Sequence, residues 1–376
     1  MQNVSSSNSQ AVNAPKLRFP GFTDEWQSQE MRSVACYNKK RASVSKSRFV
    51  STENMKQNCN GIEPYNEAIS VDGVEFCQDD ILLANIRPYL KKAWKAEFNG
   101  ACSTDVLSIK PIGINADFFF HCIEKDDFFN YVMSAAKGSK MPRGDKQHIM
   151  EYTIKMPSEA EQRIISKFIE LVTKRISEQQ KLVDALKLYK RGVLQRLFKA
   201  NITEHKENNI GSLFTVTRGY VLPLSEIRVE PDNEYCYPVY SSQTKNEGLM
   251  GYYNQYLYED AITWTTDGAN AGFVRFRKGK FYCTNVCGVL LNDDGFANEY
   301  IAERLNSVTK RHVSYVGNPK LMNNVMAEIT IEYPSLEEQR KNSLLISQMD
   351  KKIQYETSVS DSLAKLKTAL LQQMFI

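Results

Sequence analysis

Residues 151–198, EYTIKMPSEAEQRIISKFIELVTKRISEQQKLVDALKLYKRGVLQRLF, recur as residues 328–375, EITIEYPSLEEQRKNSLLISQMDKKIQYETSVSDSLAKLKTALLQQMF. The two stretches align without a gap at a constant offset of 177 residues and share 18 identities in 48 positions. A period of this length indicates a duplicated unit rather than a short solenoid repeat. Two copies of one unit predict a pseudo-twofold molecule, which suits a partner, or a pair of identical partners, with the same symmetry.

Each copy contains a strong helix signal. Ser158-Glu-Ala-Glu161 and Ser335-Leu-Glu-Glu338 are capping boxes, in which the serine hydroxyl accepts from the third backbone N–H, and a proline precedes each box. Apolar residues then recur every three or four positions with no interrupting proline. We predict long helices over 158–200 and 335–376, each about 60 Å long.

The apolar stripes of these helices predict that the two pack on each other. A helix of this length with a single stripe pairs most readily with a similar helix, as in an antiparallel coiled coil. The alternative is that each stripe is buried against the rest of the chain along most of its length. The centre of each stripe is polar, which predicts a solvated section or one that a partner protein covers. The residues expected at that partner contact are Arg175, Gln179, Lys352 and Glu356.

A mixed region precedes each helix. Short strands are predicted at 80–87, 101–109 and 116–119, and again at 260–268, 282–291 and 298–301. Their order and spacing agree while identities nearly vanish, so one scaffold presents two different surfaces. The predicted fold class is α+β, with two mixed α/β domains separated by the paired helices. The predicted division is a mobile leader at 1–16, a first domain at 17–157, a first helix at 158–200, a second domain at 201–334 and a second helix at 335–376.

Composition is that of a folded globular protein. Of 376 residues, 42% are hydrophobic and 11% aromatic, and 48 basic against 44 acidic side chains give a net charge of +4, which alone does not indicate a nucleic-acid binder. Eight cysteines without paired spacing, and no signal peptide, predict a reducing cytoplasm and no metal site. No apolar run approaches the ~18 residues of a membrane helix.

Basic loops recur at corresponding places in the two domains. Cations neutralise phosphates, and Asn, Asp and Arg can read base edges in the major groove of DNA. A solvated surface side chain is the alternative for any one residue, but the recurrence favours nucleic acid for the set. The candidates are Arg87, Tyr89, Lys91, Lys92, Lys95, Lys140, Arg143 and Lys146 in the first domain, and Thr266, Asp267, Asn270, Arg275, Arg277, Lys278, Lys280, Asn318 and Lys320 in the second.

Catalytic motifs are missing from the sequence. It has no G-x-x-x-x-G-K-[ST] phosphate loop, no glycine-rich dinucleotide fingerprint and no G-x-S-x-G elbow. We therefore expect no catalysis in this chain.

The motifs together resemble the specificity subunit of type I restriction-modification systems. The resemblance spans nearly the whole chain. One departure is Asn85-Ile-Arg87 in the first domain against Thr266-Asp-Gly268 in the second. The matching segments are Leu17-Arg-Phe-Pro-Gly-Phe22, Asp80-Ile-Leu-Leu83, Ile154-Lys-Met-Pro-Ser158 with Glu161-Gln-Arg163, and Lys190-Arg-Gly-Val-Leu-Gln-Arg-Leu-Phe198, followed by Ile331-Glu-Tyr-Pro-Ser335, Glu338-Gln-Arg340 and Leu370-Leu-Gln-Gln-Met-Phe375.

The resemblance implies two target-recognition domains that each read one half of a split site on double-stranded DNA, with antiparallel helices as spacer. It also implies two modification subunits that carry S-adenosylmethionine and two restriction subunits that use ATP and Mg, with no cofactor in this chain. A duplicated protein-binding scaffold without DNA contact is the alternative from a different class. A self-contained methyltransferase or nuclease is disfavoured by the missing motifs.

Overall fold

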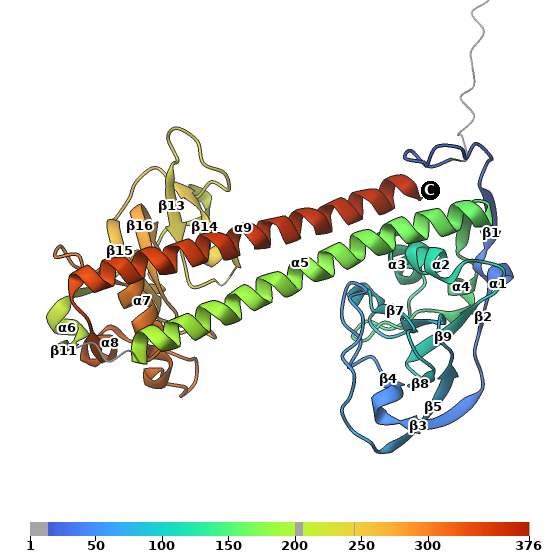
Figure 1. Cartoon of the computed structure of the whole chain (residues 1–376), viewed down its shortest axis with the longest axis horizontal. Coiled ribbons are helices and arrows are strands. Elements are labelled where there is room, and N and C mark those ends of the chain that lie inside the picture. Colours follow the sequence, from blue (N-terminus) through green and yellow to red (C-terminus); the bar gives the residue numbers. More distant parts are fainter. Residues whose placement is uncertain (1–13, 200–205, 244, 376) are drawn as a thin grey trace, which may run out of the picture. The chain divides into compact units, whose positions relative to one another are not determined.

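The computed structural model describes residues 14–199, 206–243 and 245–375, which fall into two compact units (Figure 1). Unit 1 comprises Met1–Gln179 and Val359–Ile376, and unit 2 comprises Gln180–Ser358. Each unit thus holds one mixed domain, the start of one long helix and the end of the other. Most of the predicted leader, residues 1–13, lies outside the described residues.

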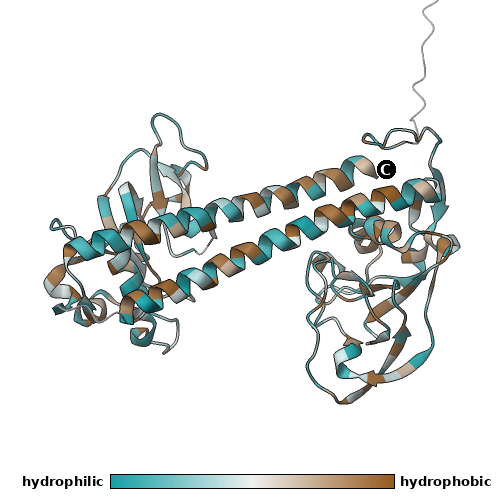
Figure 2. Ribbon diagram, viewed as in Figure 1, coloured by the Kyte–Doolittle hydropathy of each residue, from teal (hydrophilic) through white to brown (hydrophobic). Residues whose placement is uncertain are grey.

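Both predicted long helices are present as α5 (Glu159–Lys199) and α9 (Leu336–Met374). The hydroxyl of Ser158 accepts from the backbone N–H of Glu161 at 3.4 Å, and Ser335 caps the N–H of Glu338 at the same distance. Figure 2 shows hydrophobic bands recurring along both helices between polar ones, as the stripe pattern predicts.

Unit 1 contains two four-stranded sheets and one two-stranded sheet. The first sheet has the order β2-β9-β6-β7, the second β3-β5-β8-β4, and β1 pairs with β10. The strands are β1 (Gln27–Glu30), β2 (Ala35–Tyr37), β3 (Arg41–Ser45), β4 (Phe49–Val50), β5 (Ser70–Phe76), β6 (Ile81–Ala84), β7 (Ala93–Lys95), β8 (Gly100–Cys102), β9 (Val106–Pro111) and β10 (Thr153–Met156). The shorter helices are α1 (Met31–Val34), α2 (Ala116–Ile123), α3 (Asp126–Ser134) and α4 (Lys146–Met150), with 3-10 turns η1 (Lys46–Arg48) and η2 (Pro88–Leu90).

Unit 2 contains one six-stranded sheet, β12-β17-β15-β16-β13-β14, and the pair β11-β18. Its strands are β11 (Lys206–Asn209), β12 (Thr215–Arg218), β13 (Tyr237–Tyr240), β14 (Leu249–Tyr253), β15 (Tyr258–Thr265), β16 (Val274–Cys283), β17 (Cys287–Leu291) and β18 (Thr330–Tyr333). Its shorter helices are α6 (Ile210–Leu213), α7 (Glu299–Asn306) and α8 (Asn323–Glu328), with 3-10 turns η3 (Leu224–Glu226), η4 (Lys245–Gly248) and η5 (Thr309–His312).

The central strands follow the same chain order in the two units. β2-β9-β6-β7 of unit 1 corresponds to β12-β17-β15-β16 of unit 2, and a short helix, α2 or α7, follows each. The strands predicted at 116–119 and 298–301 are wrong, because 116–119 lie in α2 and 298–301 are the N-cap and first residues of α7. The side chains of Asn115 and Asn298 cap them by accepting from the N–H groups of Phe118 and Ile301, both at 3.0 Å. The stretch 101–109 also divides, into β8 and β9.

The main core of each unit includes residues from both long helices. In unit 1, Ile165 of α5 and Leu371 of α9 belong to the same buried cluster as Trp26 and Phe118. The ring of Phe375 stacks on Phe118 at a centroid distance of 5.1 Å. In unit 2 the main cluster includes Ile346 of α9, with Leu194, Leu197 and Phe198 of α5 packed against it.

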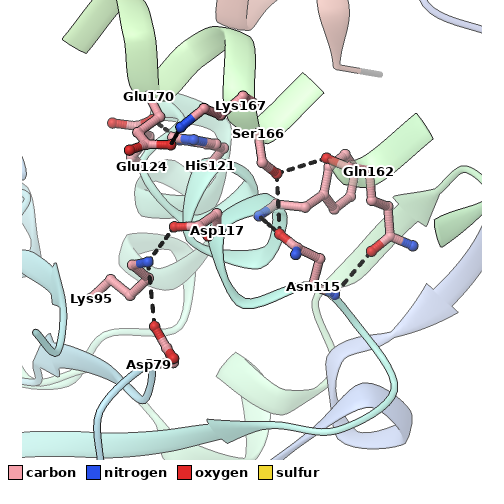
Figure 3. A network of polar contacts seen from close by, with 11 residues as sticks. Asp79, Lys95, Asn115, Asp117, His121, Glu124, Gln162, Ser166, Lys167 and Glu170 are labelled. Atoms are coloured by element: carbon pink, nitrogen blue, oxygen red, sulfur yellow. Dashed lines mark hydrogen bonds and ion pairs between the residues drawn. The ribbon is translucent and has the colours of Figure 1, made fainter. Parts of the chain in front are cut away.

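A buried polar joint connects the start of α5 to the start of α2 (Figure 3). The side-chain oxygen of Gln162 accepts from the backbone N–H of Asn115 at 3.0 Å, and its amide donates to the carbonyl of Pro157 at 3.0 Å. The hydroxyl of Ser166 donates to the Asn115 side chain at 3.2 Å. Because every member is held by a partner, this joint fixes α2 on the helix.

An ion pair holds the segment that precedes β1 on the start of α5. Both carboxylate oxygens of Glu161 bind the guanidinium of Arg18, at 2.7 and 2.8 Å, and the Glu161 side chain is buried. The ring of Phe19 meets Phe168 edge-on at 5.6 Å. The Leu17-Arg-Phe motif is therefore a docking segment for α5, and its hydrogen bond from the N–H of Leu17 to the carbonyl of Gln373 attaches it to α9 as well.

Lys190 and Lys367, 177 residues apart, each bind a carboxylate of the domain in their own unit. The ammonium of Lys367 donates to Glu124, at the end of α2, at 2.8 Å. The ammonium of Lys190 contacts Glu303 of α7 at 2.5 Å and Asp350 at 2.7 Å. Burial alone lowers the pKa of Lys190, but Glu303 and Asp350 outweigh it and raise that pKa. One lysine per unit thus ties the end of a long helix to the short helix of the domain.

Candidate nucleic-acid interface

In unit 1 the segment that follows β6 and the hairpin that precedes α4 are joined by backbone hydrogen bonds. The N–H of Arg87 donates to the carbonyl of Pro142 at 2.7 Å, and the N–H of Gly144 donates to the carbonyl of Asn85 at 3.0 Å. Hairpin 137–143 is closed by two bonds between its end residues, both 2.9 Å. We call segment 85–87 and hairpin 137–143 the first loop–hairpin pair.

Unit 2 contains the same arrangement after β15, which we call the second loop–hairpin pair (266–268 and 314–320). The N–H of Gly268 donates to the carbonyl of Pro319 at 2.9 Å, and the N–H of Leu321 donates to Thr266 at 2.9 Å. Hairpin 314–320 is again closed by two bonds of 2.9 Å between its end residues. Two predicted loops that lie far apart in the sequence are therefore brought together in each unit.

Arg87 and Gly268 occupy the same position of the two pairs and share a left-handed backbone. Their φ angles are 51° and 90°. This conformation is open to glycine but costs about 1 kcal/mol or more for a residue with a Cβ. The departure of Asn85-Ile-Arg87 from Thr266-Asp-Gly268 thus changes the side chains while the backbone path is kept.

The first pair presents mainly cations. Arg87, Lys140 and Lys146 are exposed. Arg143 is also exposed, and its guanidinium binds the carboxylate of Asp105, which precedes β9, at 2.7 Å. Sequence analysis missed Asp105, since an isolated acid in a turn gives no signal. Exposed cations thus lie on this pair and, at Lys146, directly after it.

The three lysines of segment 91–95 make contacts with other groups of unit 1. Lys91 binds Asp126 at 2.6 Å, and Lys92 donates to the carbonyl of Thr52 at 2.6 Å. Lys95 lies between Asp79 and Asp117 (Figure 3), and all three lysines are half-buried. Burial alone lowers the pKa of Lys95, but the Asp117 carboxylate brings the pKa above its ordinary value. Tyr89 is exposed.

The second pair carries less positive charge. The hydroxyl of Thr266, which is buried, donates to Asp267 at 2.9 Å, and Asp267 lies 3.8 Å from the ammonium of Lys320. Asn318 is exposed and Asn270 is half-buried. Tyr315 and Val316, at the tip of hairpin 314–320, are exposed and were not among the predicted residues. Two apolar side chains directly before a Gly-Asn-Pro turn are the signal that could have identified them.

The basic residues of β16 differ in exposure and in their partners. Arg277 is buried, donates to the carbonyl of Glu247 at 2.8 Å and lies 3.7 Å from the ring centroid of Tyr240. Its guanidinium therefore faces protein groups, and burial lowers its pKa. The direct contact of Arg277 with DNA stays a prediction. Arg275 binds Glu247 at 2.9 Å. Lys278 and Lys280 are exposed.

A small cavity of about 70 Å³ lies beside Arg275 and Arg277. Its wall includes Thr263 and Thr265 of β15 and the carboxylate-bearing Glu247. Arg275 also lines the cavity, and its ion pair with Glu247 links the η4 segment to β16.

The predicted partner-contact residues on the helices divide into two kinds. Arg175 and Lys352 are exposed, whereas Gln179 and Glu356 are buried in this chain. A solvated centre of the stripe is therefore wrong for Gln179 and Glu356. The contact of these residues with a partner stays a prediction. Lys352 binds Glu356 at 2.7 Å along one face of α9.

Within the residues that the structure describes, no cluster of three metal-ligating side chains occurs. In the same part of the chain, none of the helices is long and apolar enough to cross a bilayer.

Two solved structures resemble this chain along nearly its whole length. The type I restriction-modification S subunit from M. genitalium aligns over 96% of this chain and 99% of its own, with a TM-score of 0.64 and 15% identity. A chain from a study of complex assembly and conformational transition of the type I restriction-modification system gives a TM-score of 0.56, also at 15% identity and with the same coverage. At this identity the likeness establishes the fold.

Sequence relatives establish the family. A family model for the type I restriction modification DNA specificity domain matches residues 203–365. The N-terminal part of a type I specificity subunit of Mycoplasma pneumoniae is 36% identical over 144 residues, which are 38% of this chain and 75% of that protein. The specificity subunit of the MpnII type I restriction enzyme from the same organism is 32% identical over 151 residues, which are 39% of this chain and 44% of that protein. With the matching fold and the duplicated loop–hairpin pairs, this chain belongs to the specificity-subunit family of type I restriction-modification systems.

Proposed function

We propose that this chain binds a two-part DNA sequence through its two loop–hairpin pairs and carries no active site of its own. The observation that supports this most is that one backbone arrangement occurs in both units with different side chains. The first pair presents Arg87 and Lys140, whereas the second presents Asn318 and the Tyr315 tip. A shared backbone with unlike side chains suits two readers that recognise different base sequences.

In this proposal α5 and α9 form an antiparallel coiled coil that relates the two domains by a pseudo-twofold axis and acts as the spacer between the half-sites. Support comes from the two cores, since in each unit the start of one helix shares a cluster with the end of the other. The equivalent anchors at Lys190 and Lys367 support the same relation. Half-sites about one helical turn apart suit such a duplicated reader.

The same proposal assigns the chemistry to partner proteins in the cytoplasm. Two modification subunits with S-adenosylmethionine would transfer the methyl group to adenine, and two restriction subunits would use ATP and Mg. A duplicated reader can recruit two copies of each, which gives a closed symmetric assembly. Exposed Arg175 and Lys352 on the long helices are proposed contacts for the modification subunits.

The test uses the chain assembled with its modification subunit. The bound DNA site is found by sequencing methylated adenines, and affinity for a duplex with that site is measured at several salt concentrations. Replacing Lys140 and Lys146 by Ala removes one exposed cation from the first pair and one just after it, at the start of α4, so the slope of log affinity against log salt is expected to fall by about 2. The matched control is Lys110→Ala. Lys110 is also exposed, but it lies at the end of β9, whereas Asp105, the partner of Arg143, precedes the start of that strand.

An unchanged slope in the double variant would remove the first pair from the interface. Failure of the assembled complex to bind any duplex more tightly than heparin would favour the protein-binding scaffold instead.

A further inference from the structure

The tip of the second hairpin is the most apolar exposed feature of the candidate interface. Val316 is 92% exposed and Tyr315 is 69% exposed, and no other large apolar side chain in the described part of the chain is as exposed as Val316. Gly317 follows in a left-handed conformation, with φ of 76°, and turns the chain back toward Lys320. Hydrophobic groups held out on a turn in this way commonly mark a contact site.

The equivalent tip in unit 1 has the same length and different chemistry. Both hairpins are closed by the same pair of backbone bonds, between residues 137 and 143 and between residues 314 and 320. Tip residues Gly138-Ser-Lys-Met141 therefore correspond one for one to Tyr315-Val-Gly-Asn318. The position of Ser139 is taken by Val316, and that of Lys140 by Gly317. Thus the second tip has no cation where the first has one.

The surroundings of the second tip remain basic. Lys310 and Arg311 precede the hairpin and are exposed, and Lys320 at its base is about half exposed. A nonpolar tip flanked by cations suits a polyanion that also offers an apolar group. In the major groove of DNA the only such group on a base edge is the methyl of thymine, and a two-stranded ribbon is narrow enough to enter that groove.

We propose that Val316, supported by Tyr315, contacts a thymine methyl group and makes an A·T pair the preferred pair at one position in the half-site that unit 2 reads. This inference rests on the proposed function, since it names a base contact of the same interface. It assigns the contact to two residues outside the basic loops.

The first experiment removes only the methyl group from the DNA. With the assembled complex, each thymine in the identified site is replaced in turn by deoxyuridine. The wild type is expected to lose affinity about fourfold at one or two positions of a single half-site, since a buried methyl contributes about 0.8 kcal/mol. Val316→Ser should bind both duplexes equally. Val229→Ser, which changes another valine that is 85% exposed in unit 2, should keep the wild-type discrimination.

The second experiment exchanges the tips. Residues 315–318 are replaced by Gly-Ser-Lys-Met, the tip of unit 1, which keeps the hairpin length and its closing bonds. Sequencing of methylated adenines is expected to show one half-site with the A·T preference lost and the other half-site unchanged.

Three results would overturn the inference. Equal wild-type affinity for thymine and deoxyuridine at every position would exclude the methyl contact, while the two-part site itself would still support the proposed function. An equal loss for all sequences in Val316→Ser would indicate a backbone or wedge contact. Loss of complex assembly in that variant would place a protein, not DNA, on the tip. Absence of any two-part site would instead refute the proposed function.

Discussion

Gln162 and Gln339, separated by one repeat of 177 residues, close the same joint in the two units. The amide of Gln162 donates to the carbonyl of Pro157 at 3.0 Å, and that of Gln339 donates to the carbonyl of Pro334 at 2.9 Å. The side-chain oxygen of each accepts from the asparagine that caps α2 or α7. The glutamine in the Glu-Gln-Arg triplet is therefore the contact by which each domain is set on its helix.

Replacing Gln162 by Leu is expected to destabilise unit 1 by about 3 kcal/mol, because a buried N–H and a buried carbonyl lose their partner. Urea unfolding followed by tryptophan fluorescence in a Trp264→Phe background, which leaves the remaining tryptophans in unit 1, measures the change. Arg163→Ala alters the exposed neighbour in the same triplet and should stay within about 0.5 kcal/mol of the parent. Equal losses in the two variants would contradict the joint.

Glu161 and Glu338 are equivalent in the repeat but differ in environment. Glu161 is buried on Arg18, whereas Glu338 is exposed. Glu161→Gln should cost unit 1 about 3 kcal/mol, because the Arg18 charge loses its partner, and should increase proteolysis near Arg18. Glu338→Gln should change the stability of unit 2 by less than about 0.5 kcal/mol. Comparable effects would show that the Arg18 contact does not hold the segment.

The stability of unit 1 should depend on pH through Glu124. Burial alone raises the pKa of this carboxyl, but the hydrogen bond with His121 and the charge of Lys367 bring the pKa below its ordinary value. Its contribution is therefore present above a pH of about 4.3 and is lost as the pH falls through the lower, folded-state pKa. Lys367→Met should lower the melting temperature at pH 7, and its difference from the wild type should shrink at acid pH. A constant difference from pH 7 to 3 would contradict this linkage.

Arg277 and Lys278 are neighbours on β16 with opposite expected effects. Arg277→Met removes the bond to Glu247 and the contact with the Tyr240 ring, so it should destabilise unit 2 by about 2 kcal/mol. Lys278→Ala should leave stability within about 0.5 kcal/mol, because its side chain is exposed. Thermal unfolding of both variants, with DNA affinity at two salt concentrations, separates the structural role from the electrostatic one.

Much of the scaffold could be predicted because its signals are local. Capping serines and an uninterrupted apolar spacing specify α5 and α9 within the repeat itself. The short helices α2 and α7 were mistaken for strands, since Phe118 and Tyr300 lie in brief apolar runs whose capping asparagines were not recognised. The bounds of α5 and α9 could be predicted from the sequence. The division of each of these helices between two compact units could not.

The site was only partly predictable, for a physical reason. Charge marks a basic loop, but accessibility is decided by tertiary contacts, as the burial of Arg277 and the Lys91 ion pair show. The joining of segment 85–87 to hairpin 137–143 depends on backbone bonds between residues over 50 positions apart, which no local pattern encodes. Polarity did not indicate exposure in the centre of the helices either, because Gln179 and Glu356 are buried.

The sharing of α9 between the units has a consequence for biosynthesis. Leu371, Met374 and Phe375 are translated after the whole of the second domain, yet they fill the core that also contains Trp26 and Phe118. The domain made first is therefore left with an open hydrophobic core while roughly the next two hundred residues are translated, and it closes only when α9 emerges. A ribosome that stalls before that point holds a nascent chain with an exposed core, which is a target for chaperones and proteases.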